Sequence, residues 1–396
     1  MAAHHLPAVT TALIAGAMGV GAVRAMRAMR ALYPPPLAAR PAEGTVPRHD
    51  DKRLTAAVLM DHAGTEVSDF LLPFELLTAS GAVNVYATAP EYRPATLSGG
   101  LDVMPQLSYT DFARLPIAHA DLIVVPYMPR PDAAILDWIR SQATAGAMVL
   151  TICTGAGVAA AAGVLTGRCA TAHWGDIAGL ERRYGDVRWV RGVRFVDDGD
   201  VVASAGITSG IDATLHMIRR LSGDSAMRRA AEAIGYADQR YLDDPTAEQF
   251  RIQPADAVAL LKAALGRRPE IGVLLRDGVD ETALAAAMDT YGATFTGRTR
   301  TVSRGARTVK SRHGLTLMPR GSAHSTRTSR LLAPYAGDEE SDPPDATALP
   351  QAGAPYDALS GALDDLADRA GMTIARFAAK RLEHRTNRTV TANPEA

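Results

Sequence analysis

Short apolar runs separated by amphipathic segments begin at Leu54 and set the pattern of most of the chain. Runs typical of buried strands occur at residues 55–60, 83–87, 121–126 and 148–152. The segments 67–79 and 133–143 instead carry apolar residues at the spacing of helices. Because strand and helix patterns alternate, we expect an α/β fold with a parallel sheet covered by helices on both faces.

Shorter elements are predicted after the fourth strand. Residues 197–200 consist of three aspartates and one glycine, which is a strong turn signal. We therefore expect residues 187–190 and 195–196 to form a hairpin pair, with a further strand at 201–204. A helix is predicted to follow and to end near Leu221.

A gapless internal match predicts that the second half of the chain repeats the first. Segments 100–105 and 314–319 are similar in sequence, and the number of positions between them equals the number between Gly64 and Gly278. We call this separation the repeat offset, and residues related by it counterparts. An apolar run at 271–275 supplies the matching first strand. We therefore expect a second α/β unit built like the first.

The chain is accordingly divided into an N-terminal segment with a linker, an α/β unit, a connector and a second unit, at residues 1–53, 54–222, 223–267 and 268–390. The second unit is a degenerate copy, because Ala283 stands where the first has Asp69 and no cysteine follows Cys169. The connector is charged and predicted to be helical. Residues 338–355 are rich in Pro, Asp and Glu and predict a loose loop.

The N-terminal segment leaves two interpretations open. Residues 6–23 carry no charge over a length near the lower limit for a membrane span, and basic residues follow them. If the segment inserts, the positive-inside rule keeps the remainder of the chain in the cytoplasm, attached to the membrane. The alternative is an unstructured start of a cytoplasmic protein. Residues 33–53 are rich in proline and arginine and predict an extended linker.

Composition narrows the classes of partner. The 396 residues include 42 basic and 43 acidic ones, a formal net charge of -1, so no nucleic-acid footprint is present and no nucleic-acid partner is expected. The 2 cysteines make no disulfide framework, and no paired Cys/His spacing suggests zinc. We expect a small-molecule substrate and neither a cofactor nor a metal.

Cys153 is the main candidate for chemistry. It lies between the strand pattern 148–152 and a Gly/Ala-rich helix pattern that begins near Gly155. A strand-to-helix turn holds a side chain at the carboxyl edge of the sheet, where ligands bind in parallel α/β folds. The N–H groups of the turn would lower the pKa of the thiol and favour the nucleophilic thiolate. The competing interpretation is a small buried hydrophobe.

Four motifs in this order resemble the DJ-1/PfpI superfamily, and within it the isonitrile hydratase and GlxA-like branch. They lie at residues 67–75, 152–155, 167–174 and 205–212. The resemblance covers about residues 54–221. The degenerate second copy follows later in the chain, at about residues 268–390. It implies a flavodoxin-like, parallel-sheet sandwich in which Cys153 occupies the nucleophile elbow. Glu75, in the first motif, is either a core-facing acid or an interface acid.

The resemblance also implies catalytic roles. Cys153 would be the nucleophile, and Asp69 would sit against it as a neutral acid that moves a proton. For isonitrile hydration, Cys153 would attack the terminal carbon, and water addition would then release an N-substituted formamide. Thr154 would supply a backbone N–H to the intermediate. A peptidase triad is not expected, because Thr154 fills the position where the PfpI proteases carry a histidine.

Five residues are predicted to line the substrate pocket: Tyr127, Gly155, His173, Trp174 and Thr208. Tyr127 stands where family members commonly have a glycine whose N–H helps to bind an anion. Its own N–H can still donate, whereas its side chain would reshape the pocket. His173 and Trp174 have a competing interpretation as a structural strand end.

Two classes of function follow from the resemblance. The first is a lyase-type hydratase that acts on a small electrophile, best exemplified by an isonitrile. The alternative is a non-catalytic, ligand-sensing or stress-response protein without a DNA-binding domain. Residues 366–382 faintly resemble one helix-turn-helix motif, but the chain after Gly371 is too short for the two motifs of GlxA-like regulators. A monomer with an internal pseudo-dimer and a homodimer both stay open.

Overall fold

A computed structural model describes residues 32–35, 37, 46–251, 253, 255–256, 259, 268–292, 297–324, 326–334, 346–349 and 353–385. The membrane anchor predicted at residues 6–23 lies outside this part of the chain. Within the described part, no helix combines the length and the apolar character needed to cross a membrane.

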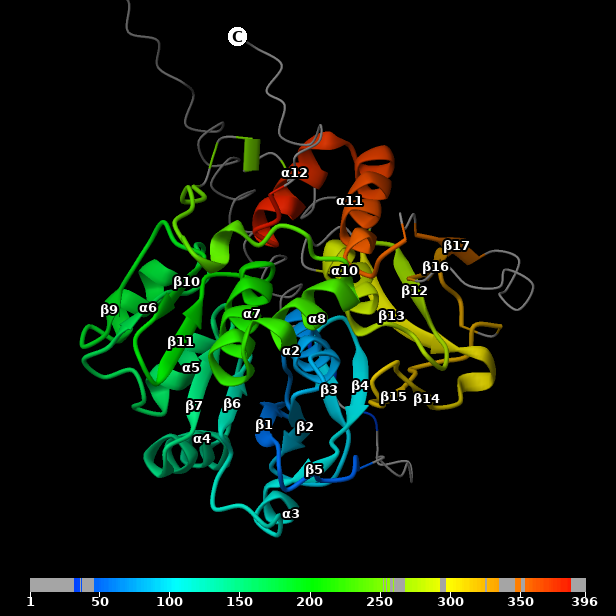
Figure 1. Cartoon of the computed structure of the whole chain (residues 1–396). Helices are drawn as coiled ribbons and strands as arrows, with labels where there is room; N and C mark the ends of the chain where they lie inside the picture. Colours follow the sequence, from blue (N-terminus) through cyan, green and yellow to red (C-terminus); the bar gives the residue numbers. More distant parts are fainter. Residues whose placement is uncertain are drawn as a thin grey trace, which may run out of the picture.

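Seven strands form the sheet that carries Cys153, in the order β10-β11-β7-β6-β1-β2-β5 (Figure 1). All neighbours are parallel except β10 and β11. The strands are β1 Leu54–Leu59, β2 Val83–Ala89, β5 Leu107–Ser108, β6 Leu122–Val125, β7 Met148–Thr151, β10 Phe195–Asp197 and β11 Val201–Ser204. The predicted α/β fold with a mostly parallel sheet is confirmed.

Helices cover both faces of this sheet. In β1, Ala56 and Val58 pack toward one group of helices, whereas Ala57 and Leu59 pack toward the other. The first group is α2 Val67–Ala79, α7 Ser209–Ser222 and α8 Asp224–Ile234, and the second is α4 Ala133–Ala145, α5 Gly155–Ala161 and α6 Ile177–Arg183. Burial on both faces explains why the strands are continuous apolar runs rather than alternating ones.

A second sheet has four parallel strands in the order β13-β12-β16-β17. Its strands are β12 Glu270–Leu275, β13 Arg298–Ser303, β16 Arg330–Ala333 and β17 Ala346–Ala348, and its helices are α10 Glu281–Gly292, α11 Asp357–Ala370 and α12 Met372–Arg381. Two 3-10 helices lie at η1 Arg240–Leu242 and η2 Arg304–Ala306. The first strand of this sheet lies between its second and third strands, as β1 lies between β2 and β6.

A small antiparallel sheet joins the two halves in the order β14-β15-β4-β3. Its strands are β3 Ala95–Leu97, β4 Leu101–Met104, β14 Val309–Lys310 and β15 Thr316–Met318. Leu317 pairs with Val103, its counterpart at the repeat offset. The isolated bridge Thr65–Leu97 likewise has a counterpart in the second half, at Val279–Ser311. Positions related by the repeat offset therefore face one another across the junction.

Helix α2 lies between the two sheets and packs against α10, as well as against α7 and α8 (Figure 1). Every residue of α2 from Val67 to Leu77 is buried. Buried apolar side chains of both sheets form one continuous core around it, so the two halves share a hydrophobic interior. The first turn of α2 is thereby fixed from both sides, which matters because that turn carries Asp69.

Two local predictions were wrong. The strand β9 Arg188–Trp189 pairs with β8 Cys169–Ala170, not with β10, because the turn at 197–200 instead joins β10 to β11. The connector, predicted to be helical, contains α8 and η1, and its described residues 255–256 and 259 are helical as well. Gly235 ends α8 in a left-handed conformation. The segment 338–355 was predicted to be a loose loop, but its residues 346–348 form β17. Its described residues 353–355 form a bend and a turn directly before α11.

The segment that resembled a helix-turn-helix motif is two helices of the second half. Helix α11 ends at Ala370, and Gly371 has a φ of 93°, so the chain turns before α12 begins at Met372. Helix α11 packs against α10 and α12. Residues 366–382 therefore belong to two helices of the packed second half.

Candidate active site

Cys153 lies in a tight turn between β7 and α5. Its φ is 57°, in the left-handed region that a non-glycine residue rarely adopts and that is common at functional sites. The Cys153 N–H donates to Ser204 Oγ at 3.4 Å, which ties the turn to β11. A Cβ on Gly155 would lie 2.1 Å from the carbonyl oxygen of Val125, so only glycine fits there. Close packing therefore enforces the geometry of the elbow.

The sulfur of Cys153 is enclosed. The residue is 7% exposed, and Sγ lies 3.8 Å from the Thr154 hydroxyl, which donates to Asp176 Oδ2 at 2.9 Å. Burial raises the pKa of the Cys153 thiol well above its ordinary value, and the carboxylates of Asp69 and Glu66 raise it further. The donors of the turn predicted a lowered pKa, but desolvation outweighs them. The resting sulfur is a thiol.

Asp69 lies in the first turn of α2 and is 0% exposed. Its Oδ2 accepts a hydrogen bond of 3.0 Å from the backbone N–H of Tyr127, whereas its buried Oδ1 has no hydrogen-bond partner among the described residues. Burial raises the pKa of Asp69 to about 8, although the Tyr127 N–H opposes the shift. At neutral pH most of this carboxyl is protonated. It also lies near enough to Cys153 to influence the thiol electrostatically.

Glu66 is a second acid at this place, and sequence reasoning missed it. It is the N-cap of α2, where its Oε2 accepts a hydrogen bond of 2.6 Å from the Asp69 N–H. Its own N–H donates to the Tyr127 carbonyl at 2.9 Å. Burial, followed by the charge of Asp69, raises the pKa of Glu66 to about 8. Its position just before a predicted helix was the available signal, since capping residues stand there.

The second half of the chain completes the acidic group. Asp289 of α10 accepts a hydrogen bond from the Ser68 hydroxyl and contacts the Glu66 carboxyl. Burial and the charge of Glu66 raise the pKa of Asp289 well above its ordinary value. The signal for this residue was the internal repeat, because Asp289 is the counterpart of Glu75, another acid of the first motif. We define Glu66, Asp69 and Asp289 as the acid cluster.

The N-terminal residues 32–35 pack beside the acid cluster. A Cβ on Gly64 would lie 2.5 Å from Cδ1 of Tyr33, and the Leu32 carbonyl accepts a hydrogen bond of 2.8 Å from Gly99. Burial raises the pKa of the half-buried Tyr33 well above its ordinary value, and Glu66 adds to the shift. The start of the predicted linker is therefore in contact with the body of the protein.

The predicted pocket residues separate into two groups. Tyr127 and Gly155 lie at the elbow with Cys153 and Thr154. The other three are His173, Trp174 and Thr208, and they contact the end of α12 and the residues after it. His173 Nε2 and Trp174 Nε1 bond to the carbonyls of Arg381 and Lys380, each at 3.0 Å, and Thr208 donates to the Glu383 carbonyl at 2.8 Å. These three hold the end of α12 and Glu383 beyond it, although His173 Nδ1 also lies 3.4 Å from Asp176.

Sequence comparison finds relatives for the first half of the chain. The model of the DJ-1/PfpI family matches residues 55–220. The isonitrile hydratase of Pseudomonas putida is 32% identical over 179 residues, which cover 43% of this chain and 73% of that enzyme. The regulator CdhR of Pseudomonas aeruginosa, of the helix-turn-helix type, is 31% identical over 143 residues, which cover 35% of this chain but 41% of the regulator.

Solved structures also match the first half. The structure of Drosophila melanogaster DJ-1beta superposes with a TM-score of 0.43 and 21% identity, covering 47% of this chain and all 100% of that one. An AraC family transcriptional regulator from Pseudomonas putida superposes with a TM-score of 0.39 and 21% identity, covering 46% of this chain and 98% of that one.

Proposed function

Because this chain belongs to the DJ-1/PfpI family, we propose that it is a cysteine-dependent hydratase that adds water to a small electrophile, with an isonitrile as the best candidate. The observation that carries the proposal is the strained elbow of Cys153 beside Asp69, a buried acid that is protonated at neutral pH. The similarity to an isonitrile hydratase supports the choice of substrate.

The first step forms two bonds. Asp69 donates its proton to the terminal carbon of the isonitrile while the Cys153 sulfur bonds to that carbon, and the thiol proton passes to the Asp69 carboxylate. The product is a thioimidate on Cys153. Because the thiol is protonated at rest, attack and proton transfer occur together, and the raised pKa of Asp69 matches this exchange.

Water completes the reaction. It adds its oxygen to the thioimidate carbon, the sulfur leaves and regains a proton, and the nitrogen takes the other proton as the N-substituted formamide is released. In this proposal, the backbone N–H of Thr154 donates to the negative charge that develops on the reacting group beside Cys153. The Thr154 hydroxyl already donates to Asp176, so its role is to orient the turn and not to donate to substrate.

The alternative is a ligand-sensing or stress-response protein. Two observations favour it: Cys153 is only 7% exposed, and the pKa of its thiol is raised. The similarity to a transcriptional regulator points the same way. A sensor of this kind would bind a small molecule at the elbow without changing it. Reversible oxidation of Cys153 would need a more exposed thiol with a lower pKa.

We also propose that residues 268–390 are a degenerate copy of the first unit, so that the chain contains its own pseudo-dimer. The matching strand orders and the pairing of Val103 with Leu317 support this proposal. A monomer is then expected in solution, because α10 of the same chain already packs against α2 as the second half of a pseudo-dimer. Light scattering that gives the mass of a dimer would contradict it.

The test of the proposed activity is formamide production. The full chain is mixed with a panel of small isonitriles, and product is followed by proton NMR. We expect turnover by the wild type and by Cys169→Ser, and none by Cys153→Ala. Binding of the isonitriles without any product would favour the sensor. Equal turnover by wild type and Cys153→Ala would exclude the cysteine mechanism.

A further inference from the structure

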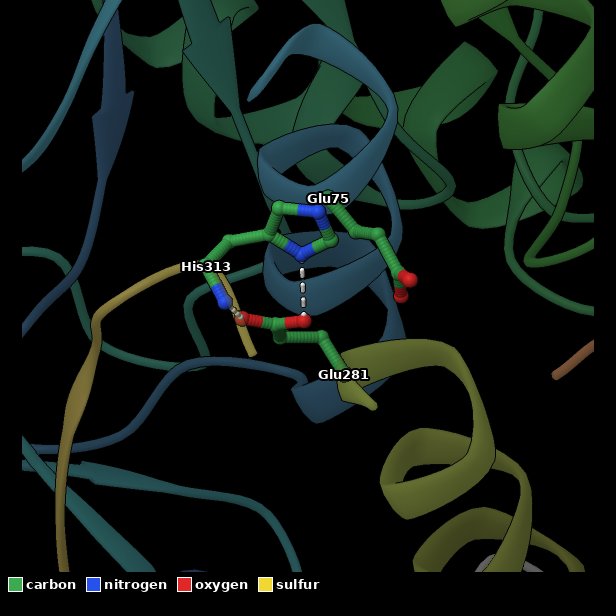
Figure 2. A group of neighbouring side chains, drawn as sticks. All are labelled: Glu75, Glu281 and His313. Atoms are coloured by element: carbon green, nitrogen blue, oxygen red, sulfur yellow. Dashed lines mark hydrogen bonds and ion pairs between the residues drawn. The ribbon is translucent and has the colours of Figure 1, made fainter. Parts of the chain in front are cut away.

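A second group of ionisable side chains lies where α2, α10 and the β14–β15 turn meet. It consists of Glu75 in α2, Glu281 at the start of α10, and His313 (Figure 2). Each offers one ligand atom, and these atoms all lie within 4.8 Å of one another. Both glutamates are 0% exposed, so the two carboxyl groups face each other away from water.

Existing hydrogen bonds satisfy most of the group but not all of it. Glu281 Oε2 lies 2.8 Å from His313 Nδ1, and Glu281 Oε1 accepts from the His313 backbone N–H at 3.0 Å. Glu75 Oε2 accepts from the Thr282 N–H at 2.6 Å, whereas the buried Glu75 Oε1 has no hydrogen-bond partner among the described residues. Figure 2 shows this carboxyl extending from α2 beside the other two side chains. A buried, unpartnered carboxyl oxygen is costly unless something binds it.

The group has a defined relation to the acid cluster. Ser68 donates its hydroxyl proton to Asp289, and Thr282, the counterpart of Ser68, donates its backbone N–H to Glu75, the counterpart of Asp289. The two contacts are reciprocal across the junction. The glutamate–histidine group therefore occupies the place in the second half that the acid cluster occupies in the first. Ala283 replaces the acid equivalent to Asp69 there, and His313 brings a different donor.

We propose that Glu75, Glu281 and His313 bind a divalent transition-metal ion, with zinc as the best fit. Two carboxylates balance the charge of the ion, and one imidazole favours zinc over calcium or magnesium. Glu281 Oε2 and His313 Nδ1 lie 2.8 Å apart, a hydrogen-bond distance. Two ligands at about 2.0–2.2 Å from a tetrahedral zinc lie about 3.4 Å apart, so zinc binding would move these two atoms slightly apart. Zinc then replaces the proton between these two atoms and leaves a fourth position for water.

The surroundings suit such an ion. The His313 side chain is 16% exposed and gives the ion a route from solvent. The neighbouring cation of Arg312 is already paired with Asp280. The expectation of no metal rested on the absence of paired Cys/His spacing, a pattern that does not report ligands from distant segments of the chain. The site is separate from Cys153, so it stands whether or not the proposed hydratase activity does.

The test uses the full chain with Cys153→Ala, which removes the elbow thiol as a competing ligand. After treatment with a chelator, zinc chloride is titrated by calorimetry, with one bound ion per chain expected. Glu281→Gln and His313→Gln each remove a direct ligand and should weaken binding by more than the roughly 10–100-fold that follows loss of an outer-shell partner. Asp280→Asn is the matched control: it removes a neighbouring carboxylate but no ligand, so it should change affinity far less.

Zinc-edge X-ray absorption on the same protein keeps the proposal falsifiable if a ligand variant does not fold. We expect one imidazole nitrogen and carboxylate oxygens as ligands of the ion, and no sulfur. The proposal is overturned by the absence of stoichiometric zinc binding. It is also overturned by a sulfur ligand, or by affinity that falls equally in Asp280→Asn and Glu281→Gln.

Discussion

Tyr127 donates its backbone N–H to Asp69 Oδ2 at 3.0 Å, so a residue just after β6 positions the acid of the elbow through its main chain. The Tyr127 carbonyl accepts from Glu66 N–H at 2.9 Å, which closes the link to the start of α2. A tyrosine in this position therefore keeps the donor that a glycine would supply. The difference lies in the side chain of Tyr127, which occupies space near Cys153 that a glycine would leave free.

Replacing Tyr127 by glycine should separate these two effects. The N–H remains, so we expect kcat on a small isonitrile within about 10-fold of wild type, while isonitriles with bulkier substituents gain in kcat/KM. Tyr127→Phe is the control that keeps the volume of the side chain. A loss in Tyr127→Gly as large as that of an Asp69 variant would show that the side chain itself is required.

Asp69→Asn removes the transferable proton but keeps an acceptor for the Tyr127 N–H. We expect kcat to fall by about 10²–10⁴-fold with the fold intact, as is usual when a general acid is removed. Glu75→Gln is the matched control, since Glu75 is also a fully buried acid of α2. Activity lost equally in both variants would point to a shared structural effect.

The pKa of Asp69 predicts the pH dependence of turnover. Because burial raises that pKa to about 8, the acid is protonated below this pH and ionised above it. We expect kcat/KM to be flat near neutral pH and to decline as pH rises through about 8. A profile that instead rises through this range would indicate that a thiolate, and not a neutral acid, limits the reaction.

The same shift acts on stability. A carboxyl whose pKa is higher in the folded state than in the unfolded state favours folding at low pH and loses that contribution as pH rises toward the folded value. The free energy of unfolding should therefore decrease between about pH 4 and pH 8. Urea titrations of Asp69→Asn should show a shallower decrease than the wild type. Identical slopes would contradict the raised pKa.

Asp289 should matter to stability and to activity, because it contacts Ser68 and Glu66 from the other half of the chain. Asp289→Ala leaves a buried hydroxyl without its acceptor, so we expect a loss of about 1–3 kcal/mol in the free energy of unfolding. Asp289→Asn keeps an acceptor and should lose less. An unchanged midpoint for Asp289→Ala would show that the acid cluster is not assembled across the junction.

Periodicity was sufficient for much of the fold. The helix predicted at 67–79 has the bounds of α2, and the predicted strands overlap β1, β2, β6 and β7 with only small differences at their ends. The hairpin at 187–196 was wrong for a physical reason. A turn signal fixes where the chain reverses but not which strands pair, and the reversal at 197–200 serves β10 and β11.

The site was predictable only in part. The elbow of Cys153 follows from local residues. In contrast, Asp289 and Tyr33 come close to Glu66 and Asp69 only through packing between segments that are distant in the sequence. The pKa of the thiol was also beyond local reasoning. The donors near Cys153 suggested a thiolate, but the degree of burial, which raises the pKa, depends on how the whole chain encloses the elbow.

The central claim, covalent catalysis by Cys153, is tested most directly by intact-mass spectrometry of enzyme quenched with acid during turnover of an isonitrile. We expect a chain heavier by the mass of one isonitrile, with the adduct on the peptide that contains Cys153 and none in Cys153→Ala. Formamide production without any adduct, or an adduct carried by Cys169, would contradict it.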